Sequence, residues 1–237
     1  MTSTAVADSA ASAASVAGLV VAITGAASGI GAGLAARFAA EGALVSGCDV
    51  SAASVRTSHS AAVDVTNPAA VEAWFADVVA RFGRLDAVVA NAGIARRVSL
   101  EDAKWSDIDD VMKVNVSGVL HTFRAAIPHL RAQGGGRLVA LVSRNAELCP
   151  AGLIGYNMSK AAVIAAVRTL ARELKGSGIV VNGLIPGPSR SGMNPEGARE
   201  PDSCYPTARL LCTMAGDGPS GRSFFDGADY PFYSRFS

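Results

Sequence analysis

The chain has 237 residues, half of them hydrophobic, and its formal net charge is +1. A chain of this length and composition can bury a sizeable core as one α/β domain. The near-zero charge gives no reason to expect a nucleic acid or an acidic membrane surface as a partner, and no apolar run reaches the length of a membrane span.

Residues 1–17 are almost all Ala, Ser, Thr and Val. They have no basic start and no unbroken apolar core, so we do not expect a secretory signal. We interpret this segment as a disordered Ala/Ser-rich tail. Residues 18–237 are expected to form a single domain, because we find no internal repeat and no boundary of a second domain.

From residue 18 onward, short apolar runs alternate with segments of helical spacing. The runs are typical of fully buried parallel strands, and the helical segment 68–83 begins with Pro and ends with Gly, as many helices do. In chain order, we expect a strand at 19–24, a helix at 29–42, a strand at 43–49, a short strand ending at Val63, a helix at 68–83, a strand at 85–93, a long helical region at 104–133, a strand at 136–143, a helix at 156–175, a strand at 178–187, a helix at 207–215 and a strand at 221–227.

This alternation predicts an α/β fold in which parallel strands are joined by right-handed helical crossovers. We expect a doubly wound, seven-stranded parallel sheet with helices on both faces, making three layers. Ligands of such sheets bind beyond the carboxyl ends of the strands. The polar clusters described below all follow predicted strands or lie in the helices next to them.

The sequence "TGAASGIG" at 24–31 connects the first strand to the first helix. Its glycines permit a tight turn and a close backbone approach, and the helix start offers free N–H groups to a pyrophosphate. The spacing G-x-x-x-G-x-G differs from the usual G-x-G-x-x-G fingerprint, and a tight strand–helix corner without a ligand is the alternative. The cofactor candidates in this turn are Gly25, Ser28, Gly29, Ile30 and Gly31.

Asp49 ends the second predicted strand. An acidic side chain at this point can accept hydrogen bonds from an adenosine ribose and would repel a 2′-phosphate. Ala27 and Ser28 in the glycine turn are not basic, so they offer nothing to neutralise such a phosphate. Both observations favour NAD(H) over NADP(H), with a solvated loop aspartate as the alternative.

Tyr156 and Lys160 lie four residues apart in an otherwise Ala- and Val-rich helix. Positions i and i+4 are neighbours on a helix. Both side chains can extend from the edge of a core with their polar ends in water. Alternatively, an ammonium beside a phenol lowers the phenol's pKa and creates a tyrosine that exchanges protons near neutral pH.

The four cysteines are scattered, with no C-x-x-C spacing. This pattern favours reduced thiols in a cytoplasmic protein over disulfides or a zinc site, and we expect no metal. The cysteines are Cys48, Cys149, Cys204 and Cys212.

Taken together, these motifs resemble the short-chain dehydrogenase/reductase family, closely over 18–193. The motifs that carry the resemblance are Gly25-x-x-x-Gly29-x-Gly31, "NAG" at 91–93, Asn115, Ser143, Tyr156-x-x-x-Lys160 and "PG" at 186–187. The resemblance implies a Rossmann fold and a nicotinamide cofactor.

The resemblance also implies four catalytic roles. Tyr156 would be the acid/base, and Lys160 would lower the tyrosine pKa and bind the nicotinamide ribose. Ser143 would hydrogen-bond the substrate oxygen, and Asn115 would hold a water that relays protons through Lys160. The further cofactor residues that it implies are Asp64, Val65, Asn91, Ala92, Gly93, Pro186, Gly187 and Ser191.

Two segments depart from the family pattern. The stretch between Asp49 and Asp64 is too short for the usual helix and strand, so its helix must be short or lost. After Met193, the sequence "NPEGAREPDSCYP" stands where the family often has two lid helices, which predicts a short substrate lid at about 188–206. Four arginines in loops at the strand ends are candidates for an anionic substrate group, although loop arginines are mostly solvated: Arg96, Arg97, Arg144 and Arg190.

We therefore expect an NAD(H)-dependent oxidoreductase that interconverts a secondary alcohol and its ketone. The alternatives are a non-catalytic nicotinamide-binding sensor or scaffold, and a reductase that uses NADP(H). By resemblance, the helices at 104–133 and 156–175 would pair with symmetry mates in a homotetramer, with a homodimer as the second choice.

Overall fold

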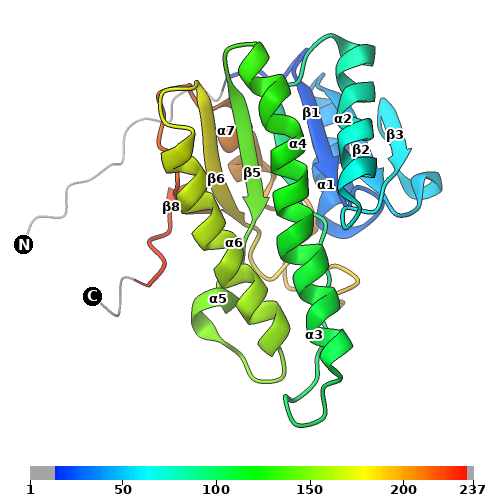
Figure 1. The fold of residues 1–237 in the computed structure, drawn as a ribbon, viewed down its shortest axis with the longest axis vertical. Coiled ribbons are helices and arrows are strands. Elements are labelled where there is room, and N and C mark those ends of the chain that lie inside the picture. The colour runs from blue at the N-terminus through cyan, green and yellow to red at the C-terminus, as the bar shows by residue number, and fades with distance from the viewer. Residues whose placement is uncertain (1–13, 234–237) are drawn as a thin grey trace, which may run out of the picture.

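The computed structural model describes residues 14–233. Its strands form one sheet in the order β3-β2-β1-β4-β5-β6-β7-β8, with helices on both faces (Figure 1). The strands are β1 (Val20–Thr24), β2 (Leu44–Asp49), β3 (His59–Ala62), β4 (Ala87–Ala90), β5 (Gly136–Leu141), β6 (Ile179–Ile185), β7 (Ser223–Phe225) and β8 (Ala228–Asp229). The helices are α1 (Gly29–Ala40), α2 (Pro68–Phe82), α3 (Trp105–Met112), α4 (Gly118–Ala132), α5 (Asn145–Leu148), α6 (Ile154–Glu173) and α7 (Tyr205–Thr213).

The predicted doubly wound sheet is confirmed, with one addition. Strands β1 to β7 pair in parallel, and β8 is an eighth, antiparallel strand that the sequence analysis did not predict. Asp226 and Gly227 both have positive φ, of 48° and 80°, and they connect Phe225 to its partner Ala228. A two-residue Asp-Gly turn of this kind reverses the chain tightly and starts a hairpin.

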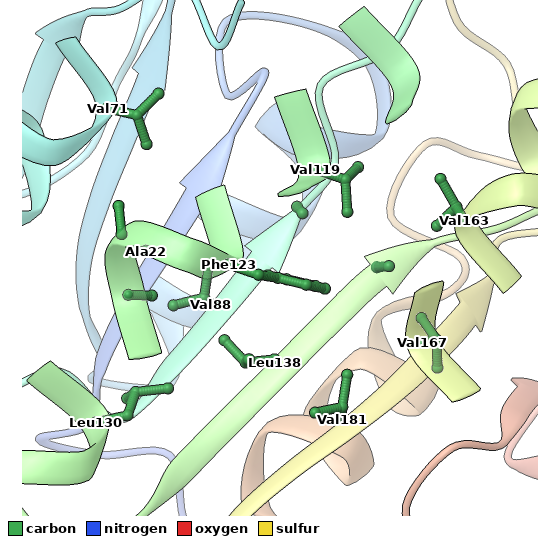
Figure 2. Close-up of a cluster of buried hydrophobic side chains, with 14 of the residues drawn as sticks. Ala22, Val71, Val88, Val119, Phe123, Leu130, Leu138, Val163, Val167 and Val181 are labelled. Carbon is green, nitrogen blue, oxygen red and sulfur yellow. The ribbon is translucent and has the colours of Figure 1, made fainter. Parts of the chain in front are cut away.

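Two hydrophobic clusters cover the two faces of the sheet, because successive side chains on a strand point in opposite directions. On β1, Val20 and Ala22 face α2, α4 and α6, and Val21 and Ile23 face α1 and α7. Figure 2 shows the first cluster, in which Phe123 from α4 lies above the middle strands. This packing fixes the strands, whose carboxyl ends then carry the loops of the site.

The long helical region consists of α3, a π-helical segment at Lys113–Ser117 and α4. The expected helix between Asp49 and Asp64 is reduced to a single 3₁₀ turn at Ala52–Ser54. Thr57 stabilises this short connection, since its hydroxyl accepts from Gly47 N at 3.2 Å and donates to His59 O at 2.6 Å. The shortened segment predicted from the sequence is therefore confirmed.

The predicted boundary of the tail at residue 17 is wrong. Val16 is only 1% exposed and packs with the α1 side of the core. Gly18 N also donates to Gly42 O at 2.9 Å, so the ordered structure begins before residue 18. The rest of the predicted tail, residues 1–13, lies outside the described residues.

Among residues 14–233, no helix combines the length and the apolar character needed to cross a membrane. The same residues contain no cluster of His, Cys, Asp and Glu side chains that could hold a metal ion. All four cysteines are free thiols, and Cys48, Cys204 and Cys212 are buried.

Candidate active site

Two adjoining cavities of about 340 Å³ each lie at the carboxyl ends of the strands. This edge is the lower one in Figure 1, where β5 points toward α5. The first cavity extends from Asp49 at the end of β2 to Lys160 on α6, and the second contains Ser143 and the start of α5. The two cavities share Ile30, Tyr156, Pro186, Ser191 and Met193.

All but two of the predicted cofactor residues line the first cavity. They are Gly25, Ser28, Gly29, Ile30, Asp49, Asp64, Val65, Asn91, Ala92, Gly93, Tyr156, Lys160, Pro186 and Ser191. The two exceptions are Gly187, which lines the second cavity, and Gly31, which packs behind the glycine turn. Several apolar members of the lining were not predicted, including Val50, Val63, Val114 and Leu141, because valines and leucines occur throughout the chain and carry no local signal of a site.

The glycine turn needs glycine at two positions. Gly25 has φ of +67°, and a Cβ there would lie 2.8 Å from Ala92 Cα. A Cβ on Gly31 would lie 2.1 Å from Gly25 O. A side chain at Gly25 would therefore clash with the loop after β4, and one at Gly31 would push α1 away from the turn.

Thr24 and Asn91 join the ends of β1 and β4. The Asn91 side chain donates to Thr24 O at 2.8 Å and to Gly25 O at 3.0 Å. In return, the Thr24 hydroxyl accepts from the backbone N–H groups of Asn91 and Ala92, at 3.1 and 3.0 Å. Thr24 was not predicted as a site residue, although its position as the last strand residue before the glycine turn is a usable signal.

The Asp49 carboxylate is partly exposed in the first cavity. It accepts from Ala27 N in the glycine turn at 3.2 Å, which holds it between β2 and that turn. Asp64 also lines the cavity, but its carboxylate accepts from the backbone and the hydroxyl of Thr66, at 2.9 and 2.8 Å. Asp49 therefore accepts one of these hydrogen bonds and Asp64 accepts two, both on the same oxygen.

Lys160 is a buried cation, 5% exposed. Its Nζ donates to Leu141 O at 2.8 Å and lies 5.5 Å from the centroid of the Tyr156 ring. Burial lowers the Lys160 pKa from 10.5 to about 8, because the charged form loses its hydration. An ammonium has three donors, so the single bond to Leu141 leaves two for a ligand in the first cavity.

The pKa of Tyr156 does not follow the prediction from its sequence spacing. Burial raises it above the usual value, and the Ser143 hydroxyl, hydrogen-bonded to the phenol, offsets part of this increase. The predicted lowering by Lys160 is wrong for the protein without its cofactor. The ammonium lies over the ring face and donates to a backbone carbonyl instead of the phenol oxygen.

Ser143 and Tyr156 meet in the second cavity. Ser143 follows β5, and its hydroxyl accepts from Asn145 N at the start of α5, at 3.2 Å. Tyr156 lies in the first turn of α6. A substrate oxygen in the second cavity would therefore find two hydroxyl groups at the border with the first cavity.

Asn115 lies apart from this group. It sits in the π-helical segment, is completely buried and lines neither cavity. Its side chain accepts from Ile94 N at 2.8 Å and donates to Ile94 O at 2.9 Å and to Ser159 Oγ at 3.0 Å. These bonds connect the loop after β4 to α6, and a π-helical turn inside a helix is frequent at functional sites.

The short lid predicted at 188–206 contains no helix before α7. Short backbone pairings between Ser189 and Arg199 and between Ser191 and Asn194 hold it together. A Cβ on Gly29 would lie 3.2 Å from Ser191 Cβ, so this loop lies directly against the glycine turn and borders both cavities.

The four loop arginines separate into two groups. Arg97 and Arg144 line the second cavity. Arg96 lines neither cavity, and Arg190 forms an ion pair with Glu200 at 2.9 Å. The structure therefore brings together only two of the four predicted candidates.

A family model for short chain dehydrogenases matches residues 19–201. The chain belongs to the short-chain dehydrogenase family. Both cavities of this short-chain dehydrogenase are lined by residues within the matched segment. Members of the family are oxidoreductases that bind a nicotinamide cofactor.

Similar proteins include D-beta-hydroxybutyrate dehydrogenase of Rhizobium meliloti (strain 1021). It is 32% identical over 124 residues, which are 52% of this chain and 48% of that protein. The short-chain dehydrogenase described here spans about half the length of the curated relatives it matches.

Solved structures match over nearly the whole chain. A 3-ketoacyl-(acyl-carrier-protein) reductase from Brucella melitensis, complexed with NADH, has a TM-score of 0.83 and 29% identity, covering 90% of this chain and 99% of that one. A short chain dehydrogenase from Burkholderia cenocepacia J2315, in complex with NADP, has a TM-score of 0.82 and 33% identity, covering 91% and 99%. Of these two structures with the same fold, one therefore contains NADH and the other NADP.

Proposed function

We propose that the chain is an NAD(H)-dependent oxidoreductase that interconverts a secondary alcohol and its ketone. The observation that supports this best is the position of Tyr156, which borders both cavities. Lys160 lies beside it in the first cavity, and Ser143 lies beside it in the second. A proton-exchanging phenol between a cofactor space and a substrate space is what alcohol oxidation requires.

The residues of the first cavity fit a nicotinamide dinucleotide. At one end, the partly exposed Asp49 carboxylate suits the two hydroxyls of an adenosine ribose. The glycine turn and the N-terminus of α1 suit the pyrophosphate, and the free donors of Lys160 suit the second ribose at the other end. Bound NAD(H) supplies the hydride donor or acceptor.

The proton steps belong to the chain's own side chains. When an alcohol is oxidised, the ionised Tyr156 accepts the hydroxyl proton at Oη and becomes the neutral phenol, and the Ser143 hydroxyl donates to the substrate oxygen as negative charge develops there. Lys160 holds positive charge over the Tyr156 ring, and its proposed effect on the phenol applies to the protein with the cofactor bound. Asn115 is proposed to hold two elements in position, the loop after β4 and helix α6. Its role in a water relay stays a prediction from family resemblance.

A panel of secondary alcohols and ketones, followed by the absorbance of NADH, tests this function. Turnover of at least one member of the panel is expected. Tight NADH binding without turnover of any compound would instead favour the non-catalytic sensor.

We expect NAD(H) to bind at least about ten-fold more tightly than NADP(H), a difference of about 1.4 kcal/mol. The reason is that the Asp49 carboxylate lines the first cavity and would repel a 2′-phosphate. Fluorescence titration of NADH and NADPH measures the ratio of their affinities. Asp49→Asn should reduce it, whereas equal affinities in the wild type would contradict the role of Asp49.

We also expect a homotetramer, or else a homodimer, that uses the outer faces of α4 and α6. Leu120 on α4 is 41% exposed and Met158 on α6 is 47% exposed, and Leu120, Phe123, Ile127 and Leu170 contribute to an apolar hollow there. Light scattering at micromolar concentration measures the assembly. Leu120→Glu should shift it toward the monomer, and a monomeric wild type would refute the expectation.

A further inference from the structure

The second cavity has a one-sided charge. Its lining includes the cations Arg97 and Arg144 and, among the described residues, neither Asp nor Glu. The remainder of the lining is small, apolar or neutral, including the Ser143 and Tyr156 hydroxyls at which the reaction is proposed to occur. An alcohol or ketone without charge would leave this pair of arginines unused.

Arg144 is oriented by an aromatic side chain. Its guanidinium lies over the Phe225 ring of β7, with 4.9 Å from Cζ to the ring centroid. It donates no hydrogen bond to any residue of the described part of the chain. Its positive charge acts on the carboxylate of Asp226, whose pKa is lowered mainly by the hydrogen bond from Arg199 and less by the charge of Arg144.

Arg199 already occupies that carboxylate. Its two terminal nitrogens donate to the two oxygens of Asp226, each at 2.7 Å, and its guanidinium also stacks on Phe225, 5.3 Å from the centroid. Two guanidinium groups therefore stack on one ring, while Arg199 takes both oxygens of the carboxylate. The donors of Arg144 remain free for a ligand in the second cavity.

The backbone that carries Arg97 is fixed on its C-terminal side. Val98 N donates to Gly152 O at 2.8 Å, and Val98 forms an isolated bridge with Leu153. A Cβ on Gly152 would lie 3.8 Å from Arg97 Cγ, so the arginine stem passes over the segment that leads into α6 and Tyr156. Its guanidinium has no ion pair or hydrogen bond with a described residue.

We propose that the substrate carries an anionic group, a carboxylate or a phosphate, which binds to Arg97 and Arg144 in the second cavity. This inference rests on the proposed function, because it places the reacting carbon at Tyr156 and Ser143 and the anion away from them. Guanidinium groups match both anions with paired hydrogen bonds. The substrate class is then a hydroxy acid or hydroxyalkyl phosphate, with its oxo counterpart.

Two matched pairs of ketones test the anion requirement. The first pair is levulinate and its methyl ester, and the second is dihydroxyacetone phosphate and dihydroxyacetone. In the wild type, kcat/KM should be about ten-fold or more higher for the anion in at least one pair. The pair that shows the preference identifies the carboxylate or the phosphate as the bound group.

Variants then assign the preference to residues. Arg97→Gln and Arg144→Gln should each reduce the anion-to-neutral ratio by about ten-fold. The matched control is Arg96→Gln, which removes the adjacent arginine that lines neither cavity and should keep the wild-type ratio. The proposal is overturned if neither anion is preferred, or if the preference survives in both Arg97→Gln and Arg144→Gln.

A binding measurement separates this proposal from the proposed oxidoreductase activity. If the neutral ketones are reduced and the anions are no better, the activity stands and the anion site fails. If no ketone is turned over, anion binding is measured directly. Levulinate and dihydroxyacetone phosphate are then titrated calorimetrically into the protein with NADH. Binding that Arg97→Gln weakens and Arg96→Gln preserves supports the anion site, and absent binding or equal loss in both variants overturns it.

Discussion

Replacing Tyr156 with Phe should lower the turnover number on the best substrate by about 10²–10⁴-fold, the usual contribution of general acid–base catalysis. The substitution removes one oxygen and keeps the ring over which the Lys160 ammonium lies. Packing of α6 and the affinity for NAD should therefore change little. Steady-state kinetics and a cofactor titration on the same preparation measure both quantities.

Tyr205→Phe is the matched control for this change. Tyr205 is also buried, but it lies on α7 and lines neither cavity, so loss of its hydroxyl should leave turnover near the wild-type level. If Tyr156→Phe keeps more than about a tenth of the activity, the proton follows another path. Tyr156 would then be a packing residue at the edge of the core.

The parts of this site that could be predicted from the sequence are those with local causes. The turn at Gly25 and Gly31 and the carboxylate of Asp49 follow strands whose continuous apolar runs are visible in the sequence. Parallel pairing then brings the ends of β1, β2 and β4 to one edge of the sheet. Their convergence on one cavity follows from the topology alone.

The parts that could not be predicted depend on burial or on partners distant in the sequence. The direction of the Tyr156 pKa shift comes from loss of hydration in the folded protein, which the spacing to Lys160 does not reveal. The stacking of Arg144 on Phe225 joins the start of α5 to β7. By contrast, the β7–β8 hairpin carries a recognisable Asp-Gly turn at Asp226 and was missed only because its strands are very short.

Lys160→Met should abolish most activity and at the same time stabilise the fold. The turnover number should fall by about 10²-fold or more, because the phenol loses its neighbouring positive charge. NAD affinity should fall about ten-fold with the loss of the ammonium donors. Kinetics and cofactor titration measure these losses, and denaturant unfolding measures the stability.

The stability gain comes from the cost of burying the ammonium. Burial lowers the Lys160 pKa from 10.5 to about 8, which corresponds to a penalty of roughly 3 kcal/mol for the charged form. Methionine has a similar length and no charge to desolvate. Losing the charge-assisted hydrogen bond to Leu141 O costs about 2 kcal/mol, so the free energy of unfolding at neutral pH should rise by about 1 kcal/mol.

The pH dependence identifies the cause of that gain. Below pH about 8, Lys160 is protonated in both the folded and the unfolded protein, so the wild type carries the full penalty. Between about 8 and 10.5 the folded lysine releases its proton while the unfolded lysine keeps it, and wild-type stability rises relative to Lys160→Met. The advantage of the variant should therefore shrink across this range.

Lys175→Met, which removes an exposed lysine just beyond α6, should show neither the gain in stability nor its pH dependence. A Lys160→Met protein that is less stable than the wild type at neutral pH, with a gap that does not change up to pH 10.5, would show that the buried ammonium is a net stabilising group.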